Sequence, residues 1–245
     1  MKLDLNADMA EGAGADDALL GIITSANVAC ALHAGSVAEM HRVMRAAAAA
    51  GVGIGAHPGF DDRAHFGRRR LTLDTEEITA LIAYQTGAAQ AVARAAGLRL
   101  RHFKLHGALA NMASEDAGLA RACYAAALAV APDLRIMVLA ATAQQAAAEA
   151  LAADWAGEIF ADRAYNDDAT LVDRSLPGAV LHEAAIAAPR ILAMLQAGAI
   201  IAESGHRIPA RIDTVCLHGD TPEAVEMARA LRAALGAAGV TLAPL

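Results

Sequence analysis

The sequence predicts an α/β fold in which residues 1–245 form one domain, a distorted (β/α) barrel. Short apolar runs alternate with longer helical patterns from one end of the chain to the other, and this alternation is typical of a mostly parallel sheet. No linker or low-complexity segment divides the chain. Polar residues follow almost every predicted strand instead of gathering at one switch point. We therefore expect a closed barrel in preference to a doubly wound open sheet.

The predicted strands are short and apolar, and most of the predicted helices are rich in alanine. We expect strands at 3–8, 25–30, 52–57, 101–106, 134–140, 157–162 and 213–218. We expect helices at 36–50, 74–97, 114–130, 142–153, 182–197 and 221–239. Local signals support the helix boundaries: Asp74-Thr75-Glu76-Glu77 resembles a capping box, and glycines suited to helix ends stand at 51, 97, 198 and 239. The long polar segment 161–178 is predicted to be a lid or binding loop.

Composition excludes several classes of protein. The formal net charge is −7, which argues against nucleic acid or an anionic membrane as the main partner. Cys30, Cys123 and Cys216 lie far apart in apolar runs without a CxxC motif, so we expect buried, reduced thiols. The chain starts directly with a strand pattern, and the uncharged stretch 18–38 is interrupted by polar residues. A cytoplasmic location without membrane attachment is the simplest prediction.

Four histidines lie at or just after the ends of predicted strands and are followed by glycine within two residues: His33, His57, His106 and His218. In parallel α/β folds the carboxyl ends of the strands lie on one rim, where the active site forms. A single histidine of this kind is more often a hydrogen-bonded framework residue. Four imidazoles from four strands predict a functional site.

Charged side chains are predicted inside the barrel as well. Asp4, Asn6 and Asp8 alternate along the first strand and so share one face. Asp8, with Glu11 just beyond it, lies nearest the predicted rim and is a candidate for metal binding or general acid–base catalysis, whereas Asp4 and Asn6 are equally well explained as deep structural hydrogen-bonding groups. Lys104, one of only two lysines, shares a face with His106. It needs a carboxylate partner and would then bind a substrate carboxylate or phosphate, unless it serves only in a structural pair.

The candidate residues divide into three groups. The catalytic candidates are Asp8, Glu11, His57, Lys104 and His106. The substrate-binding candidates are Asn6, Asn27, His33, Asn111, Asp162, Arg163, Tyr165, His218 and Asp220. Asp8, His57 and His106 would be the ligands if a divalent metal binds, a question that the residues leave open. His102 and His106 stand too far apart on one strand to share an ion. The chain has no P-loop, no GxGxxG after a strand and no GxSxG elbow.

Seven blocks of the sequence resemble the LamB/YcsF family, the family of the 5-oxoprolinase A subunits, and they follow the family's order along almost the whole chain. The blocks are LDLNADMAEG (3–12), TSANVACALHAGS (24–36), GVGIGAHPGFDDRAHFGRR (51–69), KLHGALAN (104–111), EIFADRAYNDDATLV (158–172), SLPGAV (175–180) and DTVCLHGDTPEAVEMARALRAAL (213–235).

The resemblance implies a barrel related to the glycoside hydrolase and deacetylase group. It also implies a cytoplasmic protein that works with two partners, the 5-oxoprolinase subunits B and C, to open 5-oxo-L-proline to L-glutamate, with ATP as a co-substrate of the complex. On that basis Lys104 and Arg163 would hold carboxylate or phosphate oxygens. Asp8, Glu11 or one of His33, His57 and His106 would position water or move protons.

The sequence departs from the family pattern at several positions. The usual HAGDP reads HAGSV here, which puts Ser36 in place of a carboxylate, and KPHGALYN reads KLHGALAN, which puts Leu105 and Ala110 in place of proline and tyrosine. NCDLGE reads NADMAE. Another lactam or amide substrate therefore stays open. Two other functions also stay open: a metal-dependent amide or acetyl hydrolase of the deacetylase type, and a non-catalytic substrate-binding component. Association of identical chains is left open as well.

Overall fold

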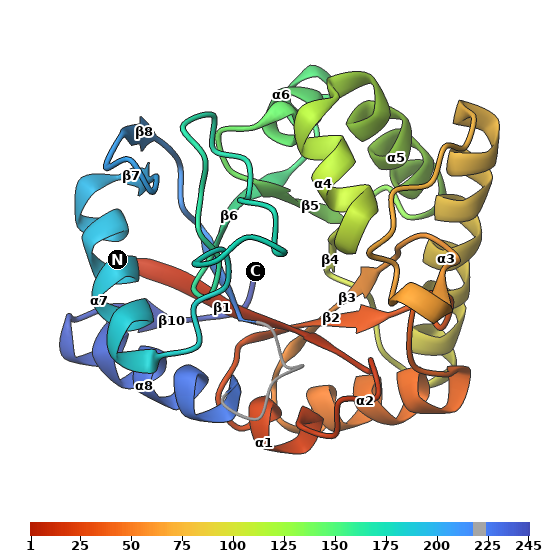
Figure 1. Cartoon of the computed structure of the whole chain (residues 1–245). Coiled ribbons are helices and arrows are strands. Elements are labelled where there is room, and N and C mark those ends of the chain that lie inside the picture. Colours follow the sequence, from red (N-terminus) through yellow and green to blue (C-terminus); the bar gives the residue numbers. More distant parts are fainter. Residues whose placement is uncertain (218–223) are drawn as a thin grey trace.

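A computed structural model describes residues 1–217 and 224–245 of the chain. Seven of its strands run parallel around one sheet, and the last of them, β9, pairs with β1 to close a barrel (Figure 1). The barrel strands, in their order around the sheet, are β1 (Lys2–Met9), β2 (Ser25–Ala29), β3 (Gly53–His57), β4 (His102–Phe103), β5 (Arg135–Leu139), β6 (Trp155–Phe160) and β9 (Thr214–Leu217). The predicted barrel fold is thereby confirmed.

Helices surround the barrel, as Figure 1 shows. They are α1 (Asp16–Leu20), α2 (Val37–Ala49), the 3-10 helix η1 (Arg63–His65), α3 (Thr75–Ala95), α4 (Gly107–Glu115), α5 (Ala117–Val130), α6 (Ala143–Ala150), α7 (Ala184–Ala197) and α8 (Ala224–Ala237). Neighbouring helices pack on one another as well as on the strands, with α3 against α5 and α7 against α8. Outside the barrel, β7 (Ala199–Ile201) and β8 (Arg207–Pro209) form an antiparallel hairpin, and β10 (Thr241–Leu242) pairs with the start of β1.

The predicted helix boundaries agree with the backbone where caps were expected. The Asp74 side chain accepts a hydrogen bond from the Glu77 N–H, and the Glu77 carboxylate accepts one from the Asp74 N–H, which completes a capping box. The glycines at 51, 97, 198 and 239 all have positive φ, the conformation that ends a helix at low cost in glycine.

Two predicted elements differ from the structure. The strand expected at 101–106 is reduced to the two residues of β4, because the chain turns at His106 to begin α4. The helix expected at 114–130 is replaced by α4 and α5, because Asp116 is extended and its carboxylate caps the N–H groups of Gly118 and Leu119. The predicted end of the last barrel strand and the predicted start of the last helix fall partly on 218–223, outside the described residues.

The barrel interior is polar along one face of β1. Asp4, Asn6 and Asp8 are all buried there, as their spacing predicts. The Asp4 carboxylate accepts hydrogen bonds from three hydroxyl groups, those of Thr24, Ser25 and Thr214. These bonds satisfy the buried acid from neighbouring strands, so the lower part of the barrel is held by a polar network as well as by apolar packing.

The cysteines are free and buried, as predicted. Among the helices that the structure describes, none is both long enough and apolar enough to cross a membrane.

Candidate active site

A cavity of about 420 Å³ opens at the carboxyl ends of the barrel strands. Its buried end is lined by Asp8, His57, Lys104, His106 and Glu158. Leu105, Met137, Leu139 and Phe160 supply an apolar wall, and Arg68, Arg70, Arg163 and Arg174 also line it. A cavity of this size, with an apolar wall and a few polar groups at its buried end, suits a small molecule.

The ammonium group of Lys104 lies between two carboxylates at the buried end of the cavity. Its Nζ lies 2.9 Å from Asp8 Oδ1 and 3.1 Å from Glu158 Oε1, so the predicted carboxylate partner is present and a second one accompanies it. Nζ also donates to Cys216 Sγ at 2.9 Å. Nζ lies 3.5 Å from Asn6 Oδ1 as well, so the three hydrogens of the ammonium group all have acceptors within the protein. Burial by itself would lower the pKa of Lys104, but the two carboxylates outweigh it and the pKa lies well above its ordinary value.

Glu158 was missed by the sequence analysis. It lies in β6, its side chain is buried, and Oε1 also accepts a hydrogen bond of 3.0 Å from Asn6 Nδ2. Burial raises its pKa, although Lys104 opposes the shift. The signal was present in the sequence, since an acid in an otherwise apolar strand needs a partner just as Lys104 does.

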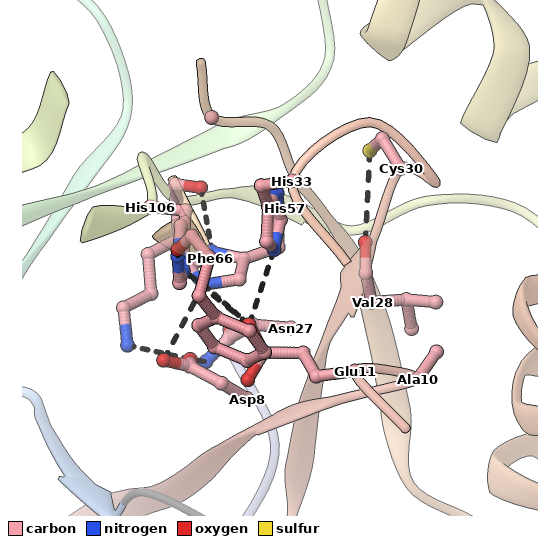
Figure 2. Close-up of polar contacts among 12 residues, drawn as sticks. Asp8, Ala10, Glu11, Asn27, Val28, Cys30, His33, His57, Phe66 and His106 are labelled. Atoms are coloured by element: carbon pink, nitrogen blue, oxygen red, sulfur yellow. Dashed lines mark hydrogen bonds and ion pairs between the residues drawn. The ribbon is translucent and has the colours of Figure 1, made fainter. Parts of the chain in front are cut away.

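His57 and His106 point their lone pairs at each other. His57 Nδ1 donates to the Lys104 carbonyl at 2.9 Å, and His106 Nε2 donates to the Phe66 carbonyl at 2.8 Å. In a neutral imidazole the other nitrogen then carries no hydrogen. Those two nitrogens, His57 Nε2 and His106 Nδ1, are 3.0 Å apart (Figure 2). Burial lowers the pKa of His106 well below its ordinary value, so that ring is neutral near pH 7.

Two carboxylates lie close to these two histidine nitrogens. Asp8 Oδ2 lies 3.3 Å from His57 Nε2, and Glu11 Oε1 lies 3.3 Å from His106 Nδ1. Ligand atoms of all four residues lie within 4.8 Å of one another. Four atoms that offer lone pairs to one small space repel one another unless a proton or a cation lies between them. Imidazole nitrogens that donate their far N–H to a carbonyl are typical of metal ligands.

The loops after β1 and β2 hold Glu11 in this cluster. His33 Nε2 lies 3.1 Å from Glu11 Oε1, and the His33 ring stacks on the His106 ring with centroids 3.8 Å apart. Gly35 has a φ of 65° and lies against the Ala10 carbonyl, where any Cβ would clash. Burial, followed by the charge of His57, lowers the pKa of His33 to about 3.

Some of the predicted binding residues line the cavity, and others contact Asp8 or Glu11. Asn111 and Arg163 line the cavity. Asn6 and Asn27 lie in the barrel network that holds Asp8, since Asn27 Nδ2 donates to both Asn6 Oδ1 and Asp8 Oδ1. They are not among the residues that line the cavity, nor is His33, which contacts Glu11 instead.

Tyr165 and Asp162 also lie away from the cavity wall. Tyr165 is buried, and its hydroxyl accepts a hydrogen bond from the Phe160 N–H. Asp162 lines a second pocket together with Leu176 and His182. His218 and Asp220 lie outside the described residues.

The polar segment predicted as a lid or binding loop does line the cavity, through Asn166 and residues 170–174. Arg163 ties its two ends together, because the guanidinium donates to the carbonyls of Val172 and Ala179. Arg163 also forms an isolated bridge with Val180. The loop is therefore anchored at its base by a buried side chain.

The sequence profile of the LamB/YcsF family matches residues 3–245. This chain belongs to the LamB/YcsF family. Within it, a protein of Ruegeria pomeroyi named as the A subunit of 5-oxoprolinase is 56% identical over 246 residues, which cover 98% of this chain and 97% of that protein. A second protein with that name, from Rhodopseudomonas palustris, is 51% identical and covers 99% of this chain and 97% of its own length.

Solved structures agree with this family membership. The lactam utilization protein of Thermus thermophilus has a TM-score of 0.91 and 41% identity, with each chain fully covered. A family 4 carbohydrate esterase of Streptomyces lividans has a TM-score of 0.52 at 9% identity, covering 98% of this chain and 91% of the esterase. At that identity the likeness is one of fold alone.

Proposed function

We propose that this chain is the A subunit of a 5-oxoprolinase, an enzyme that opens 5-oxo-L-proline to L-glutamate. The observation that carries the proposal is the cavity, where acids and imidazoles surround a buried lysine at one end and arginines lie on the wall. Relatives at 51–56% identity bear the name of this enzyme's A subunit. The substrate is a small amide with a carboxylate, which matches a cavity of about 420 Å³ with cationic walls.

Each group at the site has a proposed task. Asp8, Glu11, His57 and His106 position the attacking water. Lys104 fixes Asp8 and Glu158, since its hydrogens are already used by the protein. Arg163, Asn111 and the neighbouring arginines bind the substrate carboxylate or a phosphate. Asn6, Asn27 and His33 act by holding Asp8 and Glu11 in place.

Hydrolysis of this lactam needs activation, and we propose that ATP supplies it within a complex with subunits B and C. A five-membered lactam is unstrained and its carbonyl carbon is a poor electrophile. Phosphorylation of the amide oxygen makes it a better one, and a phosphate would then face the arginines of the cavity wall. Because the reaction consumes ATP, we expect the protein to work in the cytoplasm.

The test is glutamate release from 5-oxo-L-proline and ATP by the reconstituted complex of the three subunits. Release that stops when this chain is left out supports the proposal. A pair of partners that releases glutamate with the Ruegeria pomeroyi relative, but not with this chain in its place, contradicts it. Lactams of other sizes are then the substrates to try.

We also propose that Asp8, Glu11, His57 and His106 hold a divalent metal ion. Two imidazole nitrogens and two carboxylate oxygens form a ligand set that suits Zn²⁺, Mn²⁺ or Fe²⁺. The charges support a cation, since the three acids Asp8, Glu11 and Glu158 face only one ammonium among the described residues of the buried end. When bound, such an ion polarises an amide carbonyl and lowers the pKa of a water.

Metal binding is tested by titrating chelator-treated protein with Zn²⁺ and Mn²⁺ and by elemental analysis. We expect one ion per chain and a loss of at least about tenfold in affinity for His57→Gln. The exposed His206→Gln is the matched control and should bind as the wild type does. Equal affinity in both variants would show that the ion, if any, binds elsewhere.

A metal-dependent hydrolase that works alone is the second candidate function, and the same four-residue cluster favours it. It predicts hydrolysis of an amide or acetyl group without ATP and without partner subunits. A purely substrate-binding role predicts instead that variants of Lys104 or His57 weaken ligand binding or assembly without changing the chemical step. Single-turnover rates of the assembled complex separate these possibilities.

A further inference from the structure

We propose that Glu158 is the proton shuttle of the reaction, taking a proton from the attacking water and delivering it to the ring nitrogen as the amide bond breaks. This inference rests on the proposed lactam hydrolysis and adds a catalytic residue to it. The two oxygens of Glu158 have different environments, and that difference is the basis of the proposal.

One oxygen of Glu158 is fixed and the other faces the cavity. Oε1 forms an ion pair with Lys104 Nζ at 3.1 Å and accepts a hydrogen bond of 3.0 Å from Asn6 Nδ2. Oε2 accepts none from any residue that the structure describes, and the side chain lines the cavity. A carboxylate held by one oxygen with its other oxygen open to substrate has the geometry that a general acid–base group needs.

The other proton-bearing groups at the buried end are already engaged. Lys104 Nζ donates to Asp8, Cys216 and Asn6 and forms an ion pair with Glu158, so its three hydrogens are engaged by the protein. His57 and His106 each donate their far N–H to a backbone carbonyl and direct the near nitrogen into the four-residue cluster. The Glu158 Oε2 atom, in contrast, takes part in no hydrogen bond or ion pair with the residues that the structure describes.

Asp8 differs from Glu158 because both of its carboxylate oxygens have partners. Its Oδ1 accepts hydrogen bonds from Lys104 and Asn27, both at 2.9 Å, and its Oδ2 lies 3.3 Å from His57 Nε2. Both oxygens are therefore occupied by the cluster and its supports. Lys104 Nζ contacts one oxygen of each carboxylate, Asp8 Oδ1 and Glu158 Oε1.

The step balances with Glu158 alone as carrier. In the lactam phosphorylated on its amide oxygen, a double bond joins the ring carbon to nitrogen. The water oxygen forms a bond to that carbon, one electron pair of the double bond moves to nitrogen, and one water proton passes through Glu158 Oε2 to that nitrogen. The remaining C–N bond then breaks with its electron pair on nitrogen, the added hydroxyl becomes the C=O of an acyl phosphate, and its proton passes through Oε2 to the amine. Attack of a second water on the acyl phosphate releases inorganic phosphate and leaves the carboxylate, and Glu158 returns to its carboxylate form.

The surroundings of Glu158 favour protonation of its carboxylate during part of the catalytic cycle. Burial raises its pKa, and the negative charge of Asp8 adds to that effect, whereas Lys104 lowers it. The buried Cys216 thiol and the buried hydroxyl groups of Tyr124 and Tyr165 are further titratable groups near this acid. Burial raises the pKa of all three, so they stay neutral near pH 7 and Asp8 and Lys104 are the charges that act on Glu158.

The experiment compares Glu158→Gln with wild type in the reconstituted complex, with Glu149→Gln on the exposed surface of α6 as the matched control. Glutamine keeps the size of the side chain and an oxygen for Lys104 and Asn6. We expect kcat to fall by about 100- to 10,000-fold while KM for 5-oxo-L-proline changes by less than about threefold. Wild-type kcat/KM should also fall at low pH as Glu158 becomes protonated, and the residual activity of the variant should lack that decline. Glu149→Gln should match wild type.

Two results would overturn the proposal while leaving the proposed function standing. One is a Glu158→Gln complex with wild-type kcat and an unchanged pH profile. The other is a variant whose KM rises while kcat is kept, since Glu158 would then bind substrate and not move protons. A variant that is unfolded by circular dichroism is replaced by Glu158→Asp, which keeps the acid and should retain part of kcat. A wild-type complex that releases no glutamate would overturn the proposed function and this inference together.

Discussion

Lys104 Nζ lies 2.9 Å from Asp8 Oδ1, and both side chains are almost completely buried. Replacing Lys104 by methionine would leave Asp8 and Glu158 in the barrel without their shared cation. Removing one partner of a buried ion pair costs about 3–5 kcal/mol, because the remaining charge is uncompensated. We expect Lys104→Met to lower the free energy of unfolding by that amount in urea denaturation.

The chain supplies its own control for this measurement. Its only other lysine, Lys2, is exposed at the start of β1, and Lys2→Met should change the free energy of unfolding by less than about 0.5 kcal/mol. Equal effects of the two substitutions would mean that the buried pair contributes nothing to stability.

Stability should fall in acid partly because of His102. Burial, followed by repulsion from Lys104, lowers its pKa to about 3 in the folded chain. The unfolded chain, with a pKa of about 6.5, binds the proton first. The folded state therefore loses stability as the pH falls from about 6.5 towards 3.

His102→Gln isolates this contribution, because glutamine can still donate to Asn27 Oδ1 as His102 Nε2 does at 2.9 Å. The variant should lose less stability than wild type between pH 7 and about pH 4 in denaturation curves. His206→Gln, an exposed histidine, should follow wild type. A His102→Gln curve parallel to wild type would contradict the assignment.

Ser36 occupies the position where the family pattern has a carboxylate, and the structure gives it a local role. Its hydroxyl accepts a hydrogen bond of 3.1 Å from the Glu39 N–H at the start of α2. Aspartate caps a helix equally well. We expect Ser36→Asp to keep stability and activity, and Ser36→Ala to cost about 1 kcal/mol in thermal or urea unfolding while kcat is kept. A loss of kcat in Ser36→Ala with intact folding would instead indicate a role in the reaction.

Ala110 replaces the family's tyrosine, and it lines the cavity. Tyrosine at this position would fill part of the space that a ligand can use. We expect Ala110→Tyr to lower kcat/KM for lactams larger than 5-oxo-L-proline more than for 5-oxo-L-proline itself. The measurement is a comparison of the two substrates in the reconstituted complex, and an equal loss for both would show that residue 110 does not select by size.

The sequence predicted the barrel because the alternation of strands and helices repeats along the chain, and it predicted the polar face of β1 because Asp4, Asn6 and Asp8 are spaced by two. It could not predict α1, β10 or the β7–β8 hairpin, which are too short to show a period. The break between α4 and α5 was missed as well, since Asp116 acts as a cap inside an otherwise continuous helical pattern.

The candidate site was predicted in part. Strand ends indicated His57 and His106, and the rarity of lysine indicated Lys104. Glu158 was overlooked, and the tautomers of the two histidines depend on carbonyls of Lys104 and Phe66 that no spacing rule locates. Distances between strands far apart in the sequence follow from the closure of the barrel, and a single sequence gives no measure of them.

Gly55 in β3 packs directly against the His102 imidazole of β4, and any Cβ at residue 55 would overlap that ring. A side chain at residue 55 would therefore require a residue smaller than histidine at 102. His102 contacts Asn27, and Asn27 contacts Asp8, so the absence of a side chain at Gly55 permits a series of contacts that reaches the candidate site at the buried end of the cavity.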